Sequence, residues 1–411
     1  MKTTLALLTL LMTVCGSVEA QVVPAATGPA AQVGKLNYAL RYSESAESVS
    51  GQPNWQTGTT SGTLEYTNKS ERRPFTMEYG GGYTFTFTGP TYETGQFHHL
   101  FLSQDFLWRK WRVSATNDAS YLPQAPITGF TGIPGIGELI GVTTPAPPTD
   151  QTILSLNSHV LENQTIASLD HSIGSKTTVN LGGGYEILRY PNSDGLDTTT
   201  VTGNAEITQQ ISGRNSILAR YMYQNFSYPG YSVTFSSDTG LFGFSRKWTR
   251  DLTMDISVGP QYNSSSFPGY IPNTITTAAS ANFTYLRRSN TFGLNFTRGS
   301  NGGAGYLLGS EVDTVSGNYS KLLGVNGTFG LTGGYEQTDA LNNNGAIKAA
   351  FGTAEGSWRL GQSFIVFANY TGTYQTGTET GVLSLPTTAL NAIYNVVGFG
   401  IGYSPRQNNH K

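Results

Sequence analysis

The chain has 411 residues, of which 12% are charged and 12% aromatic, with 50 glycines and a formal net charge of −2. Soluble domains carry roughly 25% charged residues, so this composition argues against an ordinary series of soluble domains. A nearly neutral chain also gives no reason to expect nucleic acid as a partner.

The first 20 residues have the pattern of a secretory signal. Lys2 provides a positive start, residues 5–14 are apolar, and the small residues at 18–20 suit cleavage before Gln21. A lipoprotein signal that uses Cys15 is the alternative, although Val14 is branched where a small residue is expected. Cleavage after Ala20 leaves a mature chain without cysteine, and therefore without a disulfide or a thiolate nucleophile.

Alternation with a period of two dominates the chain after a lead over 21–34 that is rich in Ala, Pro and Gly. In strands, successive side chains point to opposite faces, and about ten alternating residues cross a bilayer as a tilted strand. The clearest segment, residues 178–187, has Val179, Leu181, Gly183, Tyr185 and Ile187 on one face. Residues 75–87 and 397–403 repeat the pattern, and no later apolar run reaches the ~18 residues of a membrane helix.

We expect about 18 such segments over 35–404, with 16 as the alternative count. The segments at 232–246, 310–320 and 347–358 alternate poorly. The expected short connections lie near 69–73, 108–112, 174–177, 212–215, 246–251, 287–290, 320–325 and 359–363. The expected long ones lie near 45–58, 88–96, 120–155, 189–197, 227–231, 264–274, 299–309, 337–346 and 376–391.

This layout predicts an all-β fold, a closed antiparallel transmembrane barrel that runs up and down with short periplasmic turns and long outer loops. An even strand count places both termini in the periplasm, with a tail over 405–411. Most Lys and Arg residues lie near the short turns. Aromatic residues expected at the two membrane interfaces are Tyr83, Trp108, Trp111, Tyr185, Trp248, Tyr262, Tyr335, Trp358 and Tyr403. The alternative is a soluble sandwich of glycine-rich strands.

The connection over 120–155 loses all periodicity between Pro123 and Pro148. Its apolar side chains are too many for a freely solvated loop. We expect it to fold into the pore as a constriction, with Phe130, Ile133, Ile136 and Glu138 as the residues concerned. A cap over the outer rim, or contact with a neighbouring barrel, is the alternative.

Charged residues in the polar register are the candidates for pore lining. They are Arg41, Glu65, Glu78, Glu186, Glu206, Arg220, Asp255, Glu336 and Glu355. One interpretation is that they pair across neighbouring strands and stabilise the wall. The other is that an excess of acids concentrates cations in the lumen.

Catalytic signals are missing from the sequence. His98 and His99 fall on opposite strand faces, as do Asp170 and His171, and no nucleophile elbow, zinc-protease motif or P-loop is present. We therefore expect no enzyme, no cofactor and no metal.

In strand pattern, signal and loop alternation the chain resembles outer-membrane β-barrel porins of Gram-negative bacteria. The resemblance implies an outer-membrane channel for passive diffusion of small hydrophilic solutes, with lipid and the barrel assembly machinery as partners and room for an oligomer. Such barrels commonly end on an aromatic residue, whereas here Tyr403 is followed by eight further residues, S-P-R-Q-N-N-H-K. An exit duct for a secreted polysaccharide and a structural or adhesive barrel with a blocked lumen remain as alternatives.

Overall fold

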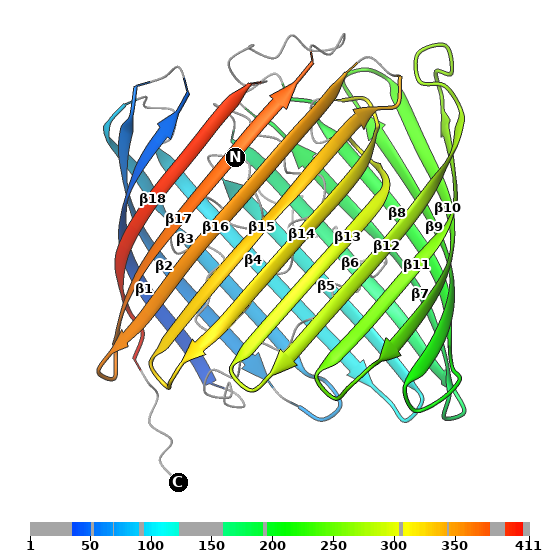
Figure 1. The fold of residues 1–411 in the computed structure, drawn as a ribbon, viewed down its shortest axis with the longest axis horizontal. Coiled ribbons are helices and arrows are strands. Elements are labelled where there is room, and N and C mark those ends of the chain that lie inside the picture. Colours follow the sequence, from blue (N-terminus) through cyan, green and yellow to red (C-terminus); the bar gives the residue numbers. More distant parts are fainter. Residues whose placement is uncertain are drawn as a thin grey trace, which may run out of the picture.

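The computed structural model describes residues 35–50, 53–68, 70–89, 94–122, 159–191, 195–303, 307–342, 345–378 and 391–405. These residues form one antiparallel sheet of 18 strands that closes into a barrel (Figure 1). The strands are β1 (Lys35–Val49), β2 (Trp55–Asn68), β3 (Phe75–Thr88), β4 (Gly95–Leu107), β5 (Trp111–Leu122), β6 (Val160–Ile173), β7 (Thr177–Arg189), β8 (Thr198–Gln210), β9 (Asn215–Tyr228), β10 (Val233–Lys247), β11 (Leu252–Ser265), β12 (Thr274–Arg287), β13 (Asn290–Asn301), β14 (Ser310–Leu323), β15 (Gly327–Ala340), β16 (Ala346–Leu360), β17 (Phe364–Gly377) and β18 (Ala392–Tyr403).

Each strand pairs with its neighbours in the chain, and the ring closes where β18 pairs with β1, from Leu40 opposite Tyr403 to Val49 opposite Tyr394. The predicted fold class and the strand count of 18 are therefore confirmed. Closure leaves no sheet edge unpaired, which is the condition for a sheet to lie in lipid. Within the described ranges, the chain forms no helix with the length and apolarity that a membrane crossing needs.

The eight short connections lie at one end of the barrel, at the bottom of Figure 1, where β1 begins and β18 ends. We call this the short-turn end and the opposite end the long-loop end. Several connections at the long-loop end are shorter than expected, because the strands continue further. The expected loop over 45–58 is wrong in its bounds, since β1 runs to Val49 and β2 begins at Trp55. Likewise, residues 120–122 belong to β5 and Tyr228 to β9.

Several expected segments lie outside the described residues. They are the signal over 1–20, the lead over 21–34, residues 123–158 with Phe130, Ile133, Ile136 and Glu138, and the tail from 406 onward.

The outer wall is apolar between two levels of aromatic residues. Leu181, Leu294 and Phe399 are among the large apolar side chains that point outward there and are exposed. Trp108, Trp111, Trp248 and Trp358 are exposed near the short-turn end, and Tyr83, Tyr262 and Tyr335 nearer the long-loop end. Tyr403 ends β18, and Tyr185 on β7 is half-buried. This arrangement is the one that aromatic girdles take at the two surfaces of a bilayer.

Neighbouring positions on β13 should differ sharply in tolerance to charge. Leu294 faces outward and Asn295 faces the lumen. We expect Leu294→Arg to lower the free energy of unfolding by roughly 2–4 kcal/mol, because it brings a cation into the apolar band, and Asn295→Arg to lower it by less than about 1 kcal/mol. Urea titration of the protein in lipid bilayers measures both values, and equal losses would contradict the assignment of the two faces.

Candidate functional site: the lumen

All nine charged residues proposed as pore-lining lie on the inward face of their strands. The cross-strand register shows this, because Glu65 stands opposite Glu78, Glu206 opposite Arg220, and Glu355 opposite Asn369. They do not share one level or one degree of exposure. Arg41 and Glu336 are buried, whereas the other seven are half-buried.

Arg41 lies against the wall of the barrel. Its guanidinium is 5.8 Å from the centre of the Phe367 ring. At this distance the positive charge is attracted to the face of the aromatic ring. Glycines make room for this contact: a Cβ at Gly400 would lie 2.4 Å from Phe367, and one at Gly402 would lie 3.3 Å from the Arg41 side chain. The glycines that alternate along β18 therefore let a flat aromatic ring and a long cation lie close to the sheet.

Glu336 is only 2% exposed. It accepts hydrogen bonds from the hydroxyls of Thr314 and Thr338, both at 3.2 Å. Burial of a carboxylate is costly unless its oxygens receive such donors.

Three inward acids have a basic partner across the sheet. Arg220 Nε donates to Glu206 at 2.6 Å, and Arg112 lies 3.1 Å from Asp105. His99 Nε2 lies 2.9 Å from Asp118. Pairing across strands, the first of the two interpretations of the charges, thus describes part of the lumen.

Acids nevertheless outnumber bases on the inward face of the described strands. The acids are Glu47, Glu65, Glu78, Asp105, Asp118, Glu162, Asp170, Glu186, Glu206, Asp255, Glu336 and Glu355. The bases that accompany them are Arg41, Arg112, Arg220, Lys247 and Arg359, besides His99. Since opposite charges cancel, the inward face of the described strands keeps a negative excess.

Sequence reasoning missed Glu47, which was expected in a loop. The residue is 7% exposed and accepts hydrogen bonds from Tyr394 at 2.6 Å and from Thr57 at 2.9 Å. Its signal was present, since Arg41, Ser43, Ser45 and Glu47 continue one polar register of β1.

Two apolar clusters lie at the long-loop end of the lumen, which the sequence did not lead us to expect. One group, the mouth cluster, consists of Leu196, Phe226, Tyr228, Phe235, Ile271, Leu308 and Leu341. Its aromatic members come from the inward faces of β9 and β10. The others, Leu196, Ile271, Leu308 and Leu341, come from described parts of four connections at the long-loop end and pack against these inward-facing rings.

Hydrogen bonds fix the mouth cluster to the wall. The Tyr228 hydroxyl donates to the carbonyl oxygen of Gly302 at 3.0 Å, and the Phe226 and Phe235 rings stack with centres 5.5 Å apart. A second group, the seam cluster, consists of Val49, Trp55, Ala392, Tyr394 and Val396. The seam cluster lies on β18, β1 and β2, whereas the aromatic residues of the mouth cluster lie on β9 and β10. Since β10 is nine strands from β1 in a ring of 18, the two clusters face each other across the mouth.

Two phenylalanines of β10 allow a matched test of the mouth cluster. Phe235 is 0% exposed within the cluster, whereas Phe242 is 71% exposed on the outer wall. We expect Phe235→Ala to lower the free energy of unfolding by about 3–5 kcal/mol, as for other buried phenylalanines. It should also raise unit conductance, because the connections that contribute to the cluster lose their anchor. Phe242→Ala is the control, and it should leave conductance unchanged; equal conductance in all three proteins would show that the cluster does not border the conducting path.

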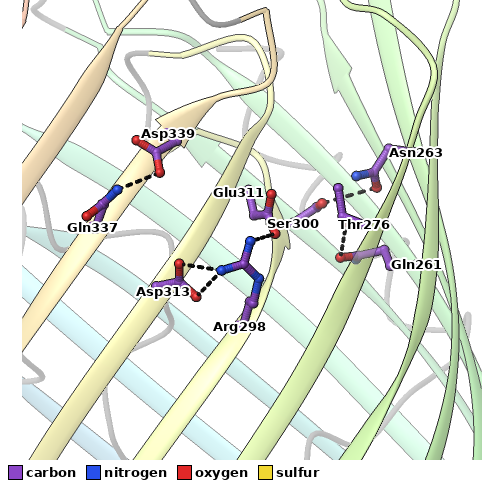
Figure 2. Close-up of polar contacts among 9 residues, drawn as sticks. All are labelled: Gln261, Asn263, Thr276, Arg298, Ser300, Glu311, Asp313, Gln337 and Asp339. Atoms are coloured by element: carbon purple, nitrogen blue, oxygen red, sulfur yellow. Dashed lines mark hydrogen bonds and ion pairs between the residues drawn. The ribbon is translucent and has the colours of Figure 1, made fainter.

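The outer face carries its own polar network at the long-loop end. Figure 2 shows Arg298 between Glu311 and Asp313, with N–O distances of 2.6 and 2.9 Å. The pairing of β13 with β14 places Arg298, Glu311 and Asp313 on the outward face of the sheet, the same face as Phe296 and Val315. The strands therefore extend beyond the apolar band into a polar surrounding.

The described residues include no group of three or more His, Cys, Asp or Glu side chains that could hold a metal ion. His98 bonds to the Tyr79 hydroxyl on the outer face at 2.9 Å, while His99 faces the lumen. The two imidazoles therefore point to opposite sides of the sheet.

A closed antiparallel barrel with an apolar outer wall, aromatic borders and a charged lumen has the architecture of porin-like outer-membrane β-barrels. No family model matches the chain, and no curated protein matches it in sequence.

Among solved structures, the chain is similar to OccAB4 of Acinetobacter baumannii, with a TM-score of 0.46 and 7% identity over 91% of this chain and 98% of that one. It is similar to OccK2 (OpdF) of Pseudomonas aeruginosa, with a TM-score of 0.46 and 11% identity over 90% and 97% of the two chains. It is also similar to OprD of Pseudomonas aeruginosa, with a TM-score of 0.40 and 10% identity over 94% and 99%. Scores and identities this low carry no functional argument, so the function must come from this chain's own residues.

Proposed function

We propose that the protein is a channel through which small hydrophilic solutes diffuse passively, with a preference for cations. The observation that carries this proposal is the excess of acids over bases on the inward face of the described strands. A ring of 18 strands is wide enough for an aqueous path. Carboxylates along such a path raise the local concentration of cations and lower that of anions.

The orientation we propose places the short-turn end in the periplasm, together with the first residue of β1 and the last of β18. Short turns on that side and longer connections outside are the usual arrangement of these barrels. The mouth cluster then borders the outer opening of the channel.

We further propose that the segment from Pro123 to Pro148 folds inward and narrows the pore. Both flanks support this, since Leu122 and Val160 are 3% and 1% exposed and share the inward face of β5 and β6. Phe130, Ile133 and Ile136 are apolar enough to pack against the mouth cluster, and Glu138 would add its charge to the path.

Planar bilayers test the proposed function directly. The purified protein should give stepwise, ohmic current increments in KCl. A properly folded protein that gives no increments would support the structural or adhesive alternative, in which side chains block the lumen. Exclusion of neutral polymers of graded size separates a narrow solute channel from a wide polysaccharide duct, since only the duct admits large polymers.

A further inference from the structure

A recess in the lumen wall at the short-turn end differs in charge from the rest of the lumen. It lies across β7 to β10. Its lining consists of Ser175, Lys176, Thr178, Thr208, Gln210, Ser212, Gly213, Arg214, Asn215, Ser216, Ser245 and Lys247. All of these residues lie in the described part of the chain. We call it the exit recess.

Three cations from different segments converge on the exit recess. Lys176 belongs to the connection between β6 and β7, Arg214 to the connection between β8 and β9, and Lys247 ends β10. Backbone hydrogen bonds hold these segments together, since Gln210 N donates to the Lys176 carbonyl at 2.7 Å and Lys247 N to the Arg214 carbonyl at 2.8 Å. The backbone of the three segments is therefore held in place by the hydrogen bonds of the sheet.

The lining adds neutral groups and no acid. Thr178, Ser216 and Ser245 are on the inward face, and Ser212 accepts two backbone N–H groups at 3.1 and 3.2 Å, which leaves its hydroxyl proton to donate. Among the described residues, no carboxylate lies within ion-pair distance of the three cations. The nearest acid along β8 is Glu206, which accepts from Thr208 at 2.9 Å and is paired with Arg220.

Cations that lack acidic partners, surrounded by hydroxyl and amide donors, match the chemistry of an oxyanion. Charge-assisted hydrogen bonds to carboxylate or phosphate are roughly twice as strong as neutral ones, and Arg can form two at once. The inward face of the described strands has more acids than bases and on balance repels such a group. In the exit recess, three cations that come from different segments offer an anionic group complementary charge.

We propose that the exit recess binds an oxyanion, the phosphate or carboxylate group of a solute that has reached the short-turn end of the channel. A free inorganic anion and an organic acid share this chemistry. Binding requires that Lys176, Arg214 and Lys247 act together, because each side chain is exposed and is weak by itself.

Equilibrium dialysis in detergent micelles tests the proposal without any need for conduction, so its result is independent of the proposed channel function. The probes are radiolabelled inorganic phosphate and radiolabelled acetate at low ionic strength. The test variant is K176Q/R214Q/K247Q. The control is R72Q/R250Q/K321Q, which removes the same charge from two other short turns and from the outward face of β14 near the short-turn end, all outside the recess.

We expect saturable binding of phosphate to the natural chain and the control, with a dissociation constant at least roughly tenfold weaker in the test variant. If phosphate alone saturates, the site selects the inorganic anion; if acetate saturates as well, it accepts carboxylates. Absence of saturable binding of either probe to the natural chain overturns the proposal, as does an equal loss in both triple variants. A heat-modifiability shift on gels confirms that each variant has folded.

Discussion

Neutralising Glu78, Glu186 and Glu206 together should reduce the preference of the channel for K⁺ over Cl⁻. Each carboxylate at about 8 Å from a passing ion in water contributes roughly 0.5 kcal/mol, so each of the three changes the K⁺ concentration at its own level of the lumen by about twofold. The effect is reinforced at Glu206, because its loss leaves the Arg220 cation without its partner at 2.6 Å. Reversal potentials across a KCl gradient measure the change.

The matched control is E44Q/D238N/D339N, which removes three acids from the outward face of β1, β10 and β15. It should leave the reversal potential near that of the natural chain. The preference should also weaken as salt rises, because the Debye length falls from about 10 Å at 0.1 M to about 3 Å at 1 M. Anion selectivity of the natural chain at low salt would contradict the proposed role of the acids.

Deleting residues 130–142 should raise unit conductance on the order of twofold or more, because the cross-section of the narrowest aqueous segment sets the current. The barrel should still assemble, since no strand is touched: β5 ends at Leu122 and β6 begins at Val160. Single-channel recording in planar bilayers gives the conductance.

A second variant separates the loss of chain from the loss of apolar packing. Changing Phe130, Ile133 and Ile136 to Ser keeps the length of the segment but removes its affinity for an apolar wall, so conductance should rise as well and become noisier. A folded deletion variant with unchanged conductance would place the segment outside the conducting path.

The sequence predicted the strands well wherever lipid constrains the outer face. Within the apolar band the outward side chain must be apolar and the inward one polar, as Val179 and Asn180 illustrate on β7. This constraint gives a strict period of two, from which the count of 18 strands and the inward face of all nine charged residues follow.

The strands that alternate poorly do so because they pass from one surrounding to another. On β10, Phe235 points inward into the mouth cluster, whereas Phe242 points outward, so the apolar register changes from odd to even along one strand. On β14, the buried Val312 faces inward and the exposed Val315 outward. Above the apolar band the outer face is polar and the inner face is packed, as in a soluble barrel, and a window that averages both parts loses the pattern.

The same reversal explains the residues that sequence reasoning missed. Trp55 is 1% exposed in the seam cluster, and Glu47 stands beside it on the inward face. Both residues were assigned to a loop because the alternation of outward apolar and inward polar residues along β1 ends near Tyr42. The mouth cluster was invisible for another reason: Leu196, Ile271 and Leu308 come from separate connections, and only the closed ring brings them together.

The pairing of β18 with β1 has a consequence for how the barrel is made. Every other pairing joins neighbours in the chain, but Ile393 and Ser50 bond across 343 residues. For a flexible chain, closing a loop of that length costs about 4 kcal/mol more entropy than closing a hairpin of five residues. Until β18 pairs with β1, both edges of the sheet are unpaired, which lipid does not tolerate. Closure is therefore a late step of assembly, because it joins residues that are far apart in the sequence. A chain that stops short of Ala392 lacks β18, so its sheet cannot close in this way and we expect that it forms no barrel.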